Sequence, residues 1–126
     1  MKSDNRQITH LKERLSVLLS THLTNLPHQF LKAASGDVLM KQDEPAKRVL
    51  LIKSGELRIE RIEDIGTAKV IAVVGANELV GEMGLIGEPY HSATVTVHQG
   101  PAERIAIQSD DLLQAALYDS DLVMEL

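Results

Sequence analysis

Residues 35–108 alternate short apolar, β-branched runs with glycine, proline and aspartate turn signals, and this repetition favours an all-β domain. Val49 to Ile52 form a continuous apolar run, as in a buried strand, whereas Leu57 and Ile59 alternate with charged residues. Many short strands with regular turns indicate a sandwich or a barrel. The order of the runs leaves the choice between a jelly roll and other all-β forms open.

Two turns and the strands around them can be placed from residue types. Ser54-Gly55 predicts a hairpin turn, and Asp64-Ile65-Gly66 predicts the next turn. Val70 to Val74 then predict a strand, and Ile105 and Ile107 mark the last strand of the series.

Helical periodicity flanks the β region on both sides, so residues 1–34 are predicted as an N-terminal helical segment and residues 109–126 as a C-terminal one. Pro27 marks a break or the first turn of a second short helix, and Ser109 is a natural helix cap. Packing against the domain is the simplest use of the N-terminal apolar stripe, with a partner helix or a coiled-coil seam as the alternative. The stripe comprises Ile8, Leu11, Leu15, Leu18, Leu19 and Leu26.

Composition describes an ordinary globule. With 126 residues, 44% hydrophobic and 25% charged, the chain fits a single domain with a real core. We find no apolar run of about 18 residues, so no membrane span is expected, and the first residues lack a signal-peptide pattern. Cysteine is absent, which excludes disulfides and thiolate metal sites. These features are compatible with a cytoplasmic location.

Charge is uneven along the chain, with a net charge of +3 over residues 1–34 and −8 over the remainder. Nucleic-acid surfaces are built from clustered lysine and arginine. We therefore expect that this chain alone does not bind nucleic acid.

The most informative motif begins at Gly81, where a glycine and an acid open a short helical turn. The first amides of such a turn, on Glu82, Met83 and Gly84, lack helical partners and favour an anion. Glu82 is suited to accept hydrogen bonds from sugar hydroxyls, and Ser92 adds a hydroxyl donor nearby. The alternative interpretation is a plain loop, helical turn and strand without a ligand.

Taken whole, residues 80–95 resemble the phosphate-binding cassette of the cyclic nucleotide-binding domain family. The family pattern is Gly-Glu-Leu/Met-Ala/Gly-Leu-Leu/Ile, a short loop, and Arg-Ala/Ser-Ala-Thr-Val. The resemblance runs from about Leu23 to the last residue, and it implies a mainly β fold: an antiparallel jelly roll (double-stranded β-helix) with N-terminal helices and short C-terminal helices. The matching stretches are Gly81 to Ile86, Ser92 to Val95, Ser35 to Leu39, Asp43 to Ala46 and Leu51 to Ile59.

The sequence departs from that pattern at His91, where the family has its phosphate-pairing arginine. Histidine has an unperturbed pKa of about 6.5 and offers one ring nitrogen at a time, whereas arginine is permanently charged and two-pronged. Either a phosphate keeps His91 protonated, which gives weaker and pH-sensitive binding, or the site no longer takes a cyclic nucleotide.

The resemblance assigns roles to matched positions. Glu82 would take the ribose hydroxyl, the backbone from Gly81 to Met83 would face the ribose and phosphate, and His91 and Ser92 would contact phosphate oxygens beside Ala93. The expected ligand-binding residues are Gly81, Glu82, Met83, His91, Ser92 and Ala93, and the expected apolar walls for the base are Met83, Val73 and Leu79.

We therefore expect a non-enzymatic regulatory domain that binds a cyclic nucleotide, cAMP or cGMP, or a related small phosphate ligand. The alternative is a degenerate fold that serves as a protein-interaction module without nucleotide. No metal or other cofactor is expected, since the sequence has no histidine pair at metal-ligand spacing. Catalysis is not expected either, because there is no nucleophile elbow and no P-loop. In the family a long C-terminal helix covers the base and often forms a homodimer interface; this chain stops about two turns into that helix, so the lid is expected to be truncated.

Overall fold

The computed structural model describes residues 13, 17, 26–64 and 66–117. Most of the predicted N-terminal helical segment and the apolar stretch after Leu117 lie outside the described residues.

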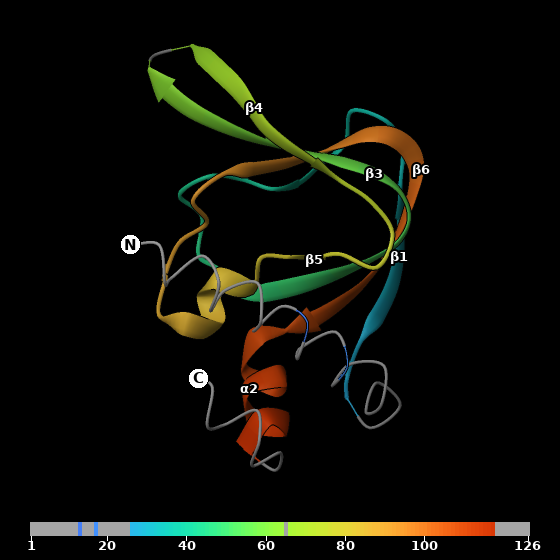
Figure 1. Cartoon of the computed structure of the whole chain (residues 1–126). Coiled ribbons are helices and arrows are strands. Elements are labelled where there is room, and N and C mark those ends of the chain that lie inside the picture. The colour runs from blue at the N-terminus through green and yellow to red at the C-terminus, as the bar shows by residue number, and fades with distance from the viewer. Residues whose placement is uncertain (1–12, 14–16, 18–25, 65, 118–126) are drawn as a thin grey trace.

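Two long strands, β3 (Arg48–Asp64) and β6 (Thr94–Gln108), form the centre of the fold and pair antiparallel along most of their length. The other strands attach to one of these two, which gives an antiparallel, mainly β architecture (Figure 1) and confirms the predicted jelly-roll class. Strands β1 (Gln29–Ala33) and β2 (Val38–Met40) pair with β6, whereas β4 (Thr67–Val74) and β5 (Leu79–Val80) pair with β3.

The hairpin turn predicted at Ser54-Gly55 is wrong, because β3 continues through these residues. Gly55 has a φ of 82° and the pairing with β6 shifts on both sides of it, from Ser54 opposite Glu103 to Glu56 opposite Gln99. A single left-handed glycine bends a strand that stays paired with its neighbour, whereas a hairpin would require the chain to reverse. The turn chemistry of Ser54-Gly55 therefore produces an irregularity inside the strand.

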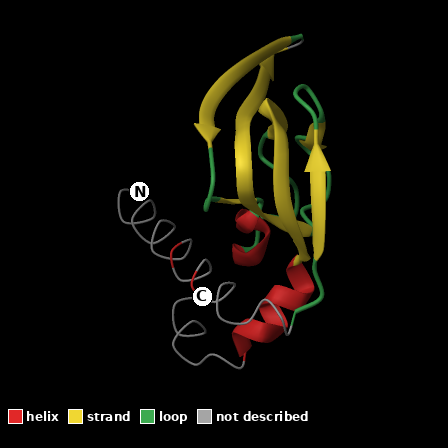
Figure 2. Cartoon of the chain, turned by 90° about the vertical axis from the view of Figure 1, so that its right-hand side faces the viewer, coloured by secondary structure: helices red, strands yellow, loops and turns green. Residues whose placement is uncertain are grey.

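The second predicted turn is confirmed, since Asp64 pairs with Thr67 and joins β3 to β4. The predicted strand at Val70 to Val74 is part of β4. In both views this hairpin extends away from the body of the domain, at the end opposite to helix α2 (Ser109–Leu117) (Figures 1 and 2).

The predicted helical segment before residue 35 is wrong for residues 29–33, which form β1. Each residue of β1 pairs with β6, from Gln29 opposite Ala106 to Ala33 opposite Ala102. The long-range ladder outweighs the local preference, because five backbone positions gain partners that a helix of this length could not match.

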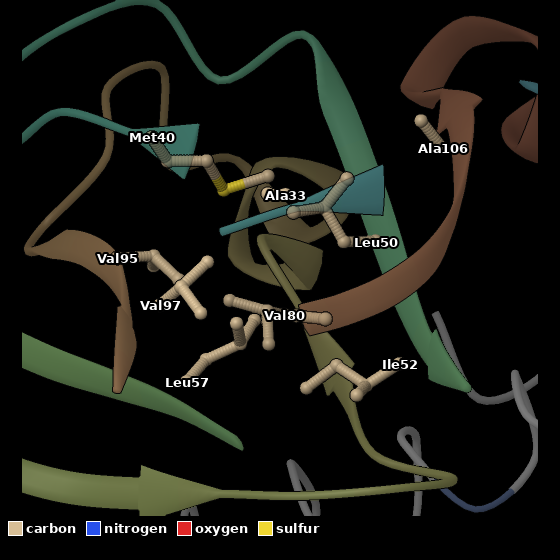
Figure 3. Close-up of a cluster of buried hydrophobic side chains, with 10 residues drawn as sticks. Ala33, Met40, Leu50, Ile52, Leu57, Val80, Val95, Val97 and Ala106 are labelled. Carbon is tan, nitrogen blue, oxygen red and sulfur yellow. The ribbon is translucent and has the colours of Figure 1, made fainter. Parts of the chain in front are cut away.

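The core consists of two hydrophobic clusters, because alternate residues of β3 point to opposite faces. Val49 and Leu51 belong to one cluster, together with Leu85 of the short helix η2 (Glu82–Ile86) and Leu112 of α2. The second cluster fills the inside of the jelly roll, where Leu57, Val80, Val95 and Val97 point toward one another (Figure 3). The two helices η2 and α2 thus share one core.

Substitution of Gly55 tests the irregularity in β3. A Cβ at Gly55 would lie 2.8 Å from the Ala102 Cα and 2.9 Å from the Pro101 carbonyl oxygen, so Gly55→Ala combines left-handed strain with a backbone clash. We expect it to lower the free energy of unfolding by about 2–4 kcal/mol.

Gly66→Ala is the matched control, because Gly66 also has a positive φ, 79°, but no atom within 4 Å of the added Cβ. It should cost about 1 kcal/mol, from the backbone conformation alone. Urea unfolding of both variants measures the difference, and equal losses would show that the contact with Ala102 does not constrain the bend.

Candidate ligand-binding site

A cavity of about 200 Å³ lies between η2, the β3–β4 hairpin and the start of β6. The structure brings together in its wall all six residues that the sequence analysis proposed for ligand binding. These are Gly81, Glu82, Met83, His91, Ser92 and Ala93.

The predicted helical turn is the 3-10 helix η2, and a left-handed glycine stands on each side of it. Gly81 has a φ of 86° and Gly87 a φ of 102°. A Cβ on Gly81 would lie 2.7 Å from the Arg48 carbonyl oxygen and 2.8 Å from the Met40 Cε. Glycine is therefore required at position 81 by the protein's own packing, in addition to any close approach of a ligand.

Glu82 supplies a carboxylate to the cavity wall and is only 6% exposed. A carboxylate offers acceptors in several directions, and hydroxyl groups of a sugar are donors of the matching kind. Gly84, two residues on, packs so closely that an added Cβ would lie 3.0 Å from both the Cβ and the carbonyl oxygen of Ala46. These small residues allow η2 to pack closely against the segment just before β3.

The loop that carries His91 is fixed by backbone hydrogen bonds to the turn before β3. The Asp43 amide donates to the His91 carbonyl oxygen at 2.8 Å, and the His91 amide donates to the Glu44 carbonyl oxygen at 2.8 Å. The Ala46 amide donates to the Pro89 carbonyl oxygen at 3.0 Å. The position of residue 91 is consequently set by the backbone and does not depend on its side chain.

Partial burial lowers the pKa of His91 below its ordinary value of 6.5. The Glu44 carboxylate acts in the opposite direction and raises the pKa, whereas the Arg48 guanidinium lowers it further. His91 is therefore mainly neutral at pH 7 when no anion is bound, because the net direction is downward.

An apolar wall faces the polar residues. Leu79 and Met83, both predicted for the base, line the cavity, but Val73 does not and is 46% exposed. The predicted role of Val73 is wrong because side chains alternate along β4, and its neighbours Ala72 and Val74 occupy the inner face. The lining residues that the sequence analysis missed are Met40, Ala46, Ile59, Ala72, Val74, Val80, Tyr90 and Val95.

The strand alternation could have identified Ile59, which follows the buried Leu57 on the same face of β3. In the same way, the pairing of Leu57 with Val74 and of Ile59 with Ala72 extends this face to β4. Choosing the correct face of β4 required the register of the β3–β4 hairpin, which residue types alone do not specify.

Side chains also tie the hairpin to the neighbouring segments. The Gln42 side-chain amide donates to the Ile62 carbonyl oxygen at 3.1 Å, and its oxygen accepts from the Ile62 amide at 2.8 Å. The Gln42 backbone amide donates to the Thr94 hydroxyl at 3.1 Å. Glu60 is the last residue of β3 that pairs with β6, opposite Thr94. Ile62 pairs with Ala68 of β4, and on its other side Gln42 takes the place of a partner from β6.

The chain belongs to the cyclic nucleotide-binding domain family, whose model matches residues 30–119. This match covers most of the chain and includes β2 to β6, η2, α2 and all of β1 except Gln29.

Solved structures with the same fold come from several bacteria. A cyclic nucleotide-binding domain from Methylobacillus flagellatus is 26% identical with a TM-score of 0.67, over 78% of this chain and 55% of that one. The catabolite activator protein of Thermus thermophilus is 24% identical with a TM-score of 0.71, over 90% and 50% of the two chains. The sensor domain of the Pseudomonas aeruginosa transcriptional regulator DNR is 20% identical with a TM-score of 0.77, over 94% and 83%.

The chain matches only about half the length of the catabolite activator protein, 50% of that chain. Within the part of the chain that the structure describes, no helix has the length and apolar character needed to cross a bilayer.

His91 should make the ligand-free domain less stable in acid. Its pKa is lower in the folded chain than the 6.5 of an exposed histidine, so the unfolded chain binds the proton more readily. The free energy of unfolding should therefore fall as the pH drops from 6.5 toward the pKa of the folded state.

Urea unfolding at pH 7.5 and pH 5.5 measures this effect, and His91→Gln should reduce the difference between the two pH values. His98→Gln is the control, because His98 is exposed on β6. An identical acid loss in the native chain and in His91→Gln would contradict the assignment.

Proposed function

We propose that this chain is a non-enzymatic regulatory domain that binds a cyclic nucleotide, cAMP or cGMP, in the cavity beside η2. The observation that carries the proposal is the convergence of Glu82, His91 and Ser92 with the start of η2 on one cavity. Membership of the cyclic nucleotide-binding domain family supports the same ligand class.

The chemistry of the lining suggests an orientation for the ligand. Glu82 would accept hydrogen bonds from the ribose hydroxyl, and His91 and Ser92 would contact the cyclic phosphate. The apolar wall of Ile59 and Val74 would lie against the base. Because the cavity holds about 200 Å³, below the roughly 300–1,000 Å³ of most small-ligand pockets, part of the ligand would remain outside it.

A shared hydrophobic core offers a route from the ligand to the C-terminal helix. Leu85 of η2 and Leu112 of α2 belong to one cluster, so a shift of η2 on binding changes the surface against which α2 packs. The regulatory output would be a change in the population of α2 positions, driven by the difference in ligand affinity between them.

Binding should strengthen as the pH falls. The phosphate favours protonated His91, and the lowered pKa means that the free domain must take up this proton on binding. Glu44 and Arg48 are the charged groups that act on His91. Isothermal titration calorimetry with cAMP and cGMP should therefore give a lower Kd at pH 6 than at pH 8.

His91→Gln should remove the pH dependence, and His98→Gln should retain it. The absence of binding heat at both pH values up to millimolar nucleotide would overturn the proposal and favour the protein-interaction module without nucleotide.

Replacing His91 by the arginine of the family pattern should strengthen binding. A charged, two-pronged hydrogen bond contributes about 1.5–3 kcal/mol, so His91→Arg should lower the Kd for cAMP by roughly tenfold or more at pH 8. The backbone bonds of residue 91 to the turn at Asp43 and Glu44 are independent of the side chain, so the variant should fold normally.

His98→Arg adds the same charge at an exposed position on β6 and should leave the Kd unchanged within about twofold. An unchanged or weaker affinity in His91→Arg would contradict the proposed position of the phosphate.

A further inference from the structure

The family's cassette arginine is absent at position 91, yet another arginine contacts Ser92, a residue that lines the cavity. Arg61 is two residues beyond Ile59 on β3, and Ile59 is two residues beyond the buried Leu57. Alternation along a strand places these three residues on one face, the face that lines the cavity at Ile59. Arg61 therefore continues the inner wall toward solvent.

A hydrogen bond connects Arg61 to the site itself. Its Nε donates to the carbonyl oxygen of Ser92 at 3.4 Å, and Ser92 lines the cavity next to His91. A guanidinium has five N–H donors, so this bond leaves the two terminal nitrogens for another acceptor. Among the described residues no carboxylate forms an ion pair with Arg61, whereas Arg58, on the opposite face, is paired with Glu60 at 2.7 Å.

A second cation faces Arg61 across the hairpin. Lys69 of β4 is the register partner of Arg61, so the two side chains project from the same face. Like charges directly opposite each other on neighbouring strands are unfavourable unless an anion lies between or beside them. The inner face of the hairpin thus carries positive charge that the described carboxylates do not pair.

The hairpin position that carries Arg61 is also held in place. The next residue, Ile62, exchanges two hydrogen bonds with the Gln42 side chain, at 2.8 and 3.1 Å. These bonds fix the backbone beside Arg61 relative to the turn that holds His91. The backbone from which the guanidinium projects is consequently held in place.

We propose that Arg61 contacts the anionic group of the ligand from the hairpin side and supplies the permanent positive charge that His91 lacks. This inference rests on the proposed function, since it names a further binding residue of the same site. The ligand it selects is an anion, and a neutral nucleoside should gain nothing from it.

The experiment is calorimetry of the full chain at pH 8, where His91 is neutral, with cAMP and with adenosine, which lacks the phosphate. Arg61→Gln should raise the Kd for cAMP about tenfold or more and leave adenosine binding unchanged. Arg61→Lys, which keeps the charge, should recover part of the cAMP affinity. Arg58→Gln removes the same charge from the opposite face of the strand and should change the Kd less than about twofold.

The other outcomes contradict the anion contact of Arg61 alone, or that contact together with the proposed function. An equal loss for cAMP and adenosine in Arg61→Gln would mean that Arg61 only holds the loop at Ser92, and the anion contact would be wrong. Native-like cAMP binding in Arg61→Gln would overturn the inference and leave the proposed function intact. No binding of cAMP or cGMP to the native chain would overturn both.

Discussion

The antiparallel ladder between β3 and β6 is the interaction on which the rest of this domain depends. Every other strand of the described residues pairs with one of these two, so none of them is held in the sheet independently of β3 and β6. The ladder also carries the bend at Gly55, which sends the first half of β3 toward β5 and the second half into the hairpin with β4. The cavity of the candidate site lies between η2, which follows β5, and this hairpin.

Residue types are sufficient to predict an element where the local sequence preference and the tertiary structure agree. The turn at Asp64 to Gly66 and the helical turn after Gly81 appear as expected, because each is determined by a few neighbouring residues. Helix α2 begins at Ser109 as expected, but the prediction that the Ser109 side chain caps it is wrong, because its hydroxyl is buried without a hydrogen-bond partner among the described residues. Residues 29–33 and Ser54-Gly55 were misassigned, because distant backbone partners on β6 decide their conformation. Periodicity within a short window contains no information about those partners.

In the candidate site, too, some residues follow from a local motif and others from distant strand pairing. A contiguous motif gave Gly81 to Met83 and the residues from His91 to Ala93, since a phosphate site built on one loop and one helical turn is local in sequence. The apolar wall comes from β3 and β4, where the choice between Val73 and Val74 depends on register, and one position moves a side chain to the other face. The contact of Arg61 with Ser92 depends on the conformation of the hairpin, which residue types alone do not predict.

Gln42 connects the β3–β4 hairpin to the body of the domain beyond the point where β6 begins. Where Thr94 ends the ladder, one carboxamide makes the two bonds that a whole strand would otherwise provide. Beyond the ladder, the position of the outer hairpin relative to the turn before β3 therefore depends in part on a single side chain.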